Sequence, residues 1–230
     1  MNAFTPTSSS APSVLICGGG IGGLAAALAL AKAGVRVTVL EQAQELGEIG
    51  AGVQLGPNAF SAFDALGIGE RARGRAVYTE RLMLRDAVDG SEIANVPVGD
   101  AFRARFGNPY AVIHRADIHL SLLEGVQENG QIELETSTRV ERIEQAGDRV
   151  AVIDQRGRAF EADAVIGCDG GKSTVRQQYV GDNARVSGHV VYRAVVDEAE
   201  FPVDLKENAP VVWCGPNCHL VHYQLRGGQQ

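Results

Sequence analysis

The stretch SVLICGGGIGGLAAALALAKAGVRVTVLE, residues 13–41, has the order strand, glycine turn, helix, strand and acid. Val14–Ile16 is a short apolar run of the kind that fills a buried parallel strand. Residues 22–33 are nearly all alanine and leucine, which predicts a helix, and Gly34 is placed to cap its C-terminus. Val35–Leu40 follows as a second apolar run. The stretch therefore predicts a βαβ unit.

The glycines of this unit have the spacing of a dinucleotide-binding turn. Gly18, Gly20 and Gly23 satisfy G-x-G-x-x-G, which supplies a tight turn, close approach to a pyrophosphate and close helix–strand packing. The first amides of the helix can bind a diphosphate. Glu41 ends the second strand, where an acid accepts hydrogen bonds from ribose hydroxyls and disfavours a 2′-phosphate. The sequence predicts FAD or NAD rather than NADP; glycines that serve packing alone are the alternative.

Composition narrows the class of protein. The chain has 230 residues, enough for one large domain or two small ones, and its net charge of −7 argues against a nucleic-acid partner or an anionic membrane surface. No apolar run approaches the ~20 residues of a spanning helix. The polar tail 1–12 predicts disorder and has no signal-peptide pattern. The four cysteines make no disulfide framework, so we expect a reducing, cytoplasmic location.

The segment after Glu41 contains spaced glycines at positions 47, 50, 52 and 56. Such spacing lets the backbone pass close to a flat ring system, although a flexible surface loop is the alternative. Pro57 suits the first position of a helix, which is predicted to run to Gly67.

The remaining pattern predicts mainly strands. A hairpin is expected over 78–88 and 91–98, a loop over 99–109, a strand over 110–114 and a helix over 115–127. A small antiparallel meander follows, with turns at 147–148 and 156–157, and then a strand over 164–168 that ends on Asp169. We expect a short helix over 172–180, a strand over 189–196, and two strands around the turn 215–217.

Four motifs in this order give the chain a family resemblance. They are residues 18–41 with the glycine turn, 50–67 (GAGVQLGPNAFSAFDALG), 114–123 (HRADIHLSLL) and 162–176 (ADAVIGCDGGKSTVR). Together they resemble the group A FAD-dependent aromatic hydroxylases, which are flavoprotein monooxygenases. The resemblance implies an α/β fold: a Rossmann-like FAD-binding domain with a parallel sheet and a small β-meander, plus an interleaved β-rich substrate domain.

The resemblance also implies domain limits and partners. Residues 13–77 and 109–185 would form the FAD-binding domain, and 78–108 and 186–230 an incomplete part of the substrate domain. The family's second acid–glycine motif, of GDAAHP type, has no counterpart here. We therefore expect the first 60% or so of a typical member and a truncated chain. The partners implied are an aromatic acid and O₂, with no nucleic acid, no membrane and a homodimer.

Particular residues acquire roles from the resemblance. The cofactor-binding residues would be Gly18, Gly20, Ile21, Gly22 and Gly23 at the pyrophosphate, Glu41 at the ribose, Gly52, Val53 and Gln54 at the isoalloxazine, and Arg115, Asp169 and Gly170. His219 and Tyr223, in the final CHLVHYQLRGG, would face the aromatic substrate. The implied reaction consumes NADH and hydroxylates a phenolic acid through a flavin C4a-hydroperoxide. The final strand favours 3-hydroxybenzoate as substrate, with salicylate, or a non-catalytic FAD-binding fragment, as alternatives.

For several of these residues an ordinary structural role is the alternative to a functional one. A phenol is activated by losing its proton, for which histidine is suited, but His219 could also be a surface histidine. His219 and Tyr223 are four apart on a predicted strand and would share a face. Arg115 could simply open a helix, and Asp169 could form only a turn. Cys214, Cys218, His219 and His222 invite a zinc site, but strand alternation separates them, so no metal is predicted.

Overall fold

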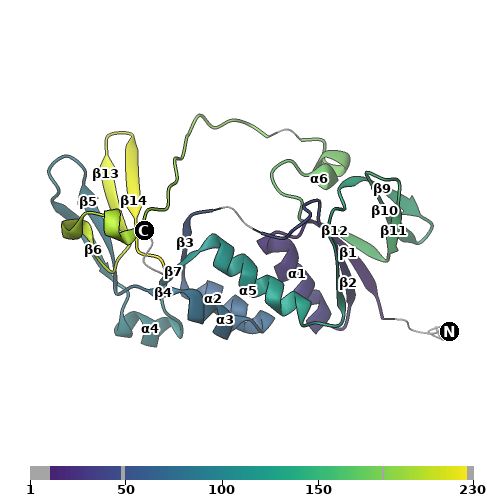
Figure 1. Cartoon of the computed structure of the whole chain (residues 1–230), viewed down its shortest axis with the longest axis horizontal. Coiled ribbons are helices and arrows are strands. Elements are labelled where there is room, and N and C mark those ends of the chain that lie inside the picture. The colour runs from purple at the N-terminus through teal and green to yellow at the C-terminus, as the bar shows by residue number, and fades with distance from the viewer. Residues whose placement is uncertain (1–10, 48–49, 183, 227–230) are drawn as a thin grey trace, which may run out of the picture. The chain divides into compact units, whose positions relative to one another are not determined.

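The computed structural model describes residues 11–47, 50–182 and 184–226 (Figure 1). Nearly all of the predicted tail, residues 1–12, lies outside this part of the chain. The chain divides into two compact units. Unit 1 comprises Met1–Gly47 and Leu122–His189, and unit 2 comprises Glu48–Ser121 and Val190–Gln230. Helix α5 (Arg115–Gln127) contributes residues to both.

These units do not follow the domain limits inferred from the sequence. Residues 48–77 and 109–121, assigned above to an FAD-binding domain, group with unit 2. Compactness and cofactor contact are different properties, because a dinucleotide can touch more than one compact unit. The assignment of these residues to the cofactor therefore stays a prediction.

Unit 1 is built on a parallel four-stranded sheet in the order β12-β1-β2-β8. Its strands are β1 (Ser13–Cys17), β2 (Arg36–Leu40), β8 (Ile132–Glu135) and β12 (Ala164–Gly167). Helix α1 (Ile21–Lys32) connects β1 to β2 and contacts both strands. The βαβ unit and the parallel sheet predicted from the sequence are thus confirmed.

The C-terminus of α1 is closed by the predicted glycine. Gly34 has a left-handed backbone with φ of 82°, which only glycine adopts without strain. Its N–H donates to the carbonyl of Ala31 at 2.9 Å, and the N–H of Val35 donates to Leu30 at 3.1 Å. These two bonds satisfy carbonyls at the helix end and turn the chain into β2.

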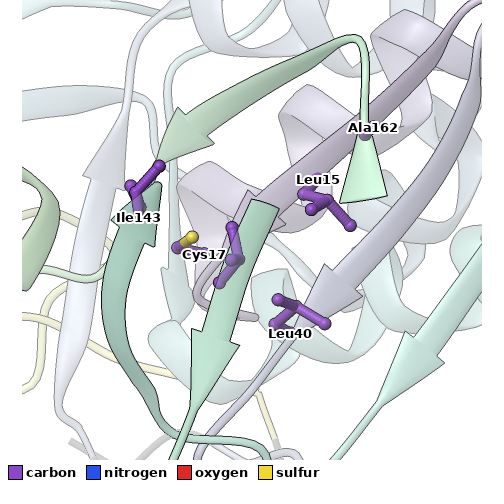
Figure 2. Close-up of a cluster of buried hydrophobic side chains, with 6 residues drawn as sticks. Leu15, Cys17, Leu40, Ile143 and Ala162 are labelled. Carbon is purple, nitrogen blue, oxygen red and sulfur yellow. The ribbon is translucent and has the colours of Figure 1, made fainter. Parts of the chain in front are cut away.

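A three-stranded antiparallel meander packs against the parallel sheet in unit 1. It consists of β9 (Val140–Ala146), β10 (Arg149–Asp154) and β11 (Ala159–Ala162), in the order β11-β10-β9. Figure 2 shows the shared core, to which the sheet contributes Leu15, Cys17 and Leu40 and the meander contributes Ile143, Val152 and Ala162. Helix α6 (Thr174–Tyr179) contacts β9. The predicted meander is confirmed.

Unit 2 contains two further sheets. One has the order β14-β13-β5-β6, with β13 parallel to β5 and the other pairs antiparallel. Its strands are β5 (Arg81–Asp86), β6 (Glu92–Pro97), β13 (Val211–Gly215) and β14 (Cys218–His222). The other has the order β3-β7-β4 and comprises β3 (Gly52–Leu55), β4 (Val77–Tyr78) and β7 (Ala111–His114).

Unit 2 also contains helices. They are α2 (Pro57–Leu66), α3 (Gly69–Arg75), α4 (Asp100–Phe106) and the first half of α5, with short 3₁₀ turns η1 (Glu198–Glu200) and η2 (Val203–Leu205). Phe60 and Ile68, in and beside α2, are fully buried. Pro57 is at the start of α2 as predicted, and Gly67 ends it with φ of 84°. No helix of the described residues is long and apolar enough to cross a membrane.

Three predictions about local structure are wrong. The predicted loop 99–109 contains α4, which Gly99 and Gly107 bound and in which the rings of Phe102 and Phe106 pack 4.6 Å apart. The predicted strand 189–196 is not a strand, because no described strand lies beside it to share hydrogen bonds. Strand β14 ends at His222, so Tyr223 lies outside it.

Candidate functional site

The glycine turn between β1 and α1 leaves no room for side chains at two of its predicted positions. Gly18 has φ of 109°, and a Cβ there would lie 2.4 Å from the carbonyl oxygen of Cys168. A Cβ on Gly23 would lie 1.9 Å from the carbonyl oxygen of Gly18. Both obstacles are backbone atoms, which cannot rotate away. The spacing of glycines in the sequence therefore has a steric cause within unit 1 itself.

The amides at the start of α1 are arranged to take an anion. Gly20 is the N-cap residue and offers no side-chain cap, and the N–H of Leu24 donates to Gly20 at 3.0 Å as the first bond of the helix. The N–H groups of Ile21, Gly22 and Gly23 precede that bond, so they belong to the orphan donors of a helix N-terminus. A Cβ on Gly22 would meet nothing within 4 Å, so this side of the turn is open. Such an N-terminus fits a diphosphate.

Glu41 braces the glycine turn from the end of β2. Its Oε2 accepts a hydrogen bond from the N–H of Gly19 at 2.7 Å, and its Oε1 accepts one from the N–H of Ala43 at 2.8 Å. An ionised carboxylate has about four acceptor positions. Two therefore remain for ribose hydroxyls, and the residue fits both tasks. Sequence reasoning foresaw a ribose ligand and missed the brace, which the pairing of β1 with β2 creates.

Asp169, the second predicted acid, is turned toward its own helix. It accepts hydrogen bonds from Ser173 Oγ at 2.5 Å, from the N–H of Thr174 at 2.7 Å and from the N–H of Val175 at 3.1 Å. Ser173 Oγ in turn accepts from the N–H of Arg176 at 2.9 Å. Asp169 therefore caps α6. Gly170 follows with a left-handed φ of 78°. Roles of these two residues at the cofactor stay predictions.

Two cysteines lie beneath the glycine turn. Burial, followed by the nearby Asp169 and Cys168, raises the pKa of the Cys17 thiol to about 12. Burial and Asp169 likewise raise the pKa of Cys168. Since the thiolate is the reactive form, both remain inert thiols at neutral pH. All four cysteines are free, in agreement with the sequence, which showed no disulfide framework.

The residues predicted to lie near a flavin ring gather around β3 in unit 2. Gly52 opens β3, and a Cβ on it would lie 2.3 Å from the ring of Tyr223. Gln54 follows Val53 on β3 and lies two residues after Gly52. Its Oε1 accepts a hydrogen bond from the hydroxyl of Tyr110 at 2.6 Å. The structure thus brings Tyr223 to the predicted flavin segment.

Burial keeps the two tyrosines of this cluster protonated. It is the largest cause of the raised pKa of Tyr223, and it raises the pKa of Tyr110 as well. Both hydroxyls therefore stay donors at neutral pH. Tyr110 was not singled out from the sequence, since a tyrosine at the start of a predicted strand carries no chemical signal by itself.

Arg115 and His219 lie at different places in unit 2. Arg115 opens α5, and a Cβ on Gly50 would lie 3.0 Å from its Cδ, so this arginine lines the glycine-rich segment. His219 is exposed on β14 and pairs in register with Cys214 on β13. Tyr223 is half-buried beyond the strand end. The expectation that His219 and Tyr223 share a strand face is therefore wrong, because β14 ends between them.

The described residues provide no geometry that supports a zinc site. The described residues contain no group of three or more His, Cys, Asp or Glu side chains that could hold a metal ion. Successive residues of β14 point to opposite faces of its sheet, so His219 faces away from Cys218 and His222.

Residues 12–217 match the protein family described as "FAD binding domain", and the chain belongs to this family. The dinucleotide predicted from the glycine turn is accordingly FAD. Among relatives, the 3-hydroxybenzoate 6-hydroxylase of Polaromonas naphthalenivorans (strain CJ2) is 67% identical over 94% of this chain and 54% of its own length. That of Klebsiella oxytoca is 59% identical over the same shares of the two chains. The chain thus spans about half the length of these relatives.

A solved structure agrees with the fold. The crystal structure of Klebsiella pneumoniae HpxO complexed with FAD and uric acid superposes with a TM-score of 0.75 at 22% identity, covering 95% of this chain and 54% of that one. At this identity the likeness concerns the fold alone. It confirms the predicted class, an α/β fold with a parallel sheet.

Proposed function

We propose that this chain is the FAD-binding part of a monooxygenase that hydroxylates 3-hydroxybenzoate to 2,5-dihydroxybenzoate (gentisate) at the expense of NADH and O₂. The observation that carries the proposal is the 67% identity to a 3-hydroxybenzoate 6-hydroxylase over 94% of the chain. The reaction balances when one oxygen atom of O₂ enters the ring and the other leaves as water, while NADH and a proton supply two electrons and the hydrogens.

In this proposal unit 1 holds the ADP half of FAD. The amides of Ile21, Gly22 and Gly23 bind the diphosphate, supported by the uncapped start of α1. Glu41 accepts hydrogen bonds from the adenosine ribose with the acceptor positions that Gly19 and Ala43 leave free. Asp169 and Gly170 contribute through the turn that they form beside Gly18, since a Cβ on Gly18 would also lie 3.1 Å from the Cα of Asp169.

Unit 2 supplies the residues for the flavin ring and the substrate. Gly52, Val53 and Gln54 would hold the flavin ring, and Tyr110 orients the amide of Gln54 through a hydrogen bond. Arg115 contributes a fixed positive charge near Gly50. Bound FAD supplies the redox chemistry that activates O₂, which no side chain can supply.

His219 acts as the general base in this proposal. Its imidazole accepts the proton of the substrate's phenolic hydroxyl, because a phenolate directs electron density to the ring carbon that is hydroxylated. Tyr223, kept protonated by burial, donates a hydrogen bond to the substrate. Support for a base at this position is the exposure of His219 on β14.

The alternatives concern substrate and activity. Salicylate is the second substrate, because related hydroxylases of aromatic acids share the same motifs, and a non-catalytic FAD-binding fragment is the second class of function. Use of NADH, a homodimer and a cytoplasmic location stay predictions.

Two assays separate these possibilities. Purified chain is titrated with FAD, and flavin fluorescence and absorbance report binding. The chain is then joined to the part of the Polaromonas relative that follows the matched region, and NADH oxidation is measured with 3-hydroxybenzoate or salicylate. Gentisate as product supports the proposal; FAD binding without substrate-stimulated oxidation supports the fragment; faster turnover of salicylate contradicts the substrate.

The base is tested by His219→Ala in the joined protein. We expect the hydroxylation rate to fall by about 10²–10⁴-fold, the usual range for a general base. His189→Ala is the matched control, because His189 is also an exposed histidine and is distant from β14 in the sequence. Equal rates for the two variants would remove the base role.

A further inference from the structure

One face of the β14-β13-β5-β6 sheet carries a stack of side chains that the proposed function does not use. The register places Arg85, Trp213 and His222 on the same face of three adjacent strands. The Arg85 guanidinium lies 5.6 Å from the centre of the Trp213 ring, and the Trp213 and His222 rings are 6.4 Å apart and stacked. The ring of Phe201 also contacts His222, with the two ring centres 5.1 Å apart. His222 thus contacts two aromatic rings.

The same stack fastens the segment 198–207 to the sheet. Phe201 follows η1 and contacts His222, while Glu207, beyond η2, pairs with Arg85 and with Arg81, the latter at 3.3 Å. Glu207 is only 17% exposed, so this pairing is sheltered from solvent. The segment is therefore attached at two points. We name the group Arg85, Phe201, Glu207, Trp213 and His222 the clasp.

The clasp has two polar atoms that are buried without a hydrogen-bond partner among the described residues, His222 Nε2 and Arg85 Nε. A neutral imidazole with Nε2 unprotonated buries one unpaired acceptor, which costs less than burying an unpaired charge. A protonated imidazole would carry a second N–H donor without an acceptor, next to the positive Arg85. The nearby carboxylate, Glu207, is already engaged by two arginines. The clasp therefore favours the neutral form of His222 over the protonated form.

The titration of His222 agrees with this geometry. Burial is the largest influence and lowers the pKa of His222; Glu207 opposes it, and Arg85 lowers the pKa further. A histidine whose pKa is lower in the folded than in the unfolded chain stabilises the fold fully above the unfolded value of roughly 6.5. That contribution is lost as the pH falls from there through the folded pKa.

We infer that His222 is a positioning residue: it holds the edge strand β14, which carries His219, and its protonation releases β14 and the segment 198–207 from the sheet. Strand β14 pairs with β13 alone, so its other edge makes no ladder with a described strand. The packing of His222 is then a restraint on the strand in addition to its pairing with β13. The consequence for catalysis rests on the proposed function, whereas the release itself does not.

The chain contains its own probe of this release. Trp213 is its single tryptophan, so tryptophan fluorescence reports the clasp alone. We expect the emission to change in one step with a midpoint below about pH 6.5. His222→Phe retains an aromatic ring at the position that contacts Phe201 and Trp213 and should remove the step. Glu207→Gln removes the group that raises the pKa of His222 and should move the midpoint to lower pH. His219→Phe, on the opposite face of β14, should keep the step unchanged.

Hydrogen exchange tests the positioning directly. At about pH 5 and about pH 7.5, exchange rates of the β14 amides are corrected for the intrinsic effect of pH. In the natural chain we expect protection to fall at least about tenfold at the lower pH, whereas in His222→Phe it should change less than about twofold. An unchanged fluorescence step in His222→Phe, or equal loss of β14 protection in both proteins, would overturn the inference. Neither measurement needs FAD or substrate, so failure of the proposed function leaves the result readable.

Discussion

Two valine-rich segments of this chain differ in burial and in secondary structure. In unit 1, β2 has Val37 and Val39 at 2% and 0% exposure. In unit 2, Val190 and Val191 are 72% and 71% exposed and belong to no strand. The composition of the two segments is similar. The contrast shows that β-propensity describes a fit to neighbouring strands rather than a property of the segment.

The neighbours of β2 are close in the sequence or supplied by the same unit. Strand β1, which α1 connects to β2, pairs with one edge of β2. Strand β8 pairs with the other edge, so both edges of β2 are hydrogen-bonded. The segment 190–196 has no such partner among the described strands. An extended chain without a partner leaves its backbone groups to water and its valines exposed.

Gly23→Ala, in the βαβ unit of unit 1, should have the largest effect on stability. The added Cβ would lie 1.9 Å from a backbone oxygen that closes the turn. We expect a loss of about 3 kcal/mol or more in the free energy of unfolding, measured by urea denaturation, together with loss of FAD binding. Gly22→Ala is the control: its Cβ meets nothing within 4 Å, and stability should change by less than about 0.5 kcal/mol. Similar losses in both variants would contradict the steric account.

Truncating one valine in each segment tests the contrast directly. Val39→Ala removes two buried methyl groups and should destabilise the chain by about 2 kcal/mol. Val191→Ala alters an exposed side chain and should change stability by less than about 0.5 kcal/mol. Thermal and urea unfolding measure both. A comparable cost at Val191 would mean that segment 190–196 is packed in solution.

Glu41→Gln should have a smaller effect. An amide offers a single acceptor oxygen, so the N–H of Gly19 or that of Ala43 loses its partner, at a cost of about 1 kcal/mol. The FAD dissociation constant should rise about tenfold, which a fluorescence titration measures. Glu45→Gln, at an exposed position of the same loop, is the control. An unchanged dissociation constant would remove Glu41 from the ribose site.

Local patterns in the sequence predicted much of this fold. The helical stripe of Ile118, Leu122, Leu123 and Val126 predicted α5 with its observed limits, and all four side chains are buried. Helix α4 was missed because it is short and buries none of its residues, so it has no apolar stripe to detect. Ser173, an N-cap residue type placed just before α6, was an available signal for the role of Asp169 as part of a helix cap.

Part of the candidate site was likewise predictable from local sequence patterns, and part depends on contacts between distant residues. The amides of the glycine turn and Glu41 lie within one βαβ unit, so residue spacing alone predicted them. The packing of Tyr223 on Gly52 joins residues that are far apart in the sequence, and no periodicity encodes it. The end of β14 at His222 likewise depends on where β13 stops offering partners, and this moved Tyr223 out of the strand that the sequence predicted.

The sequence by itself determined the dinucleotide-binding βαβ unit, because its turn, helix cap and strands depend on glycines and on hydrogen bonds within about thirty residues of chain. Only the tertiary structure decided that Tyr223 packs on Gly52, that segment 190–196 is not a strand and that His222 contacts two aromatic rings. Each of these depends on which strand or ring lies beside a residue. That choice is made by burial and backbone pairing between distant parts of the chain.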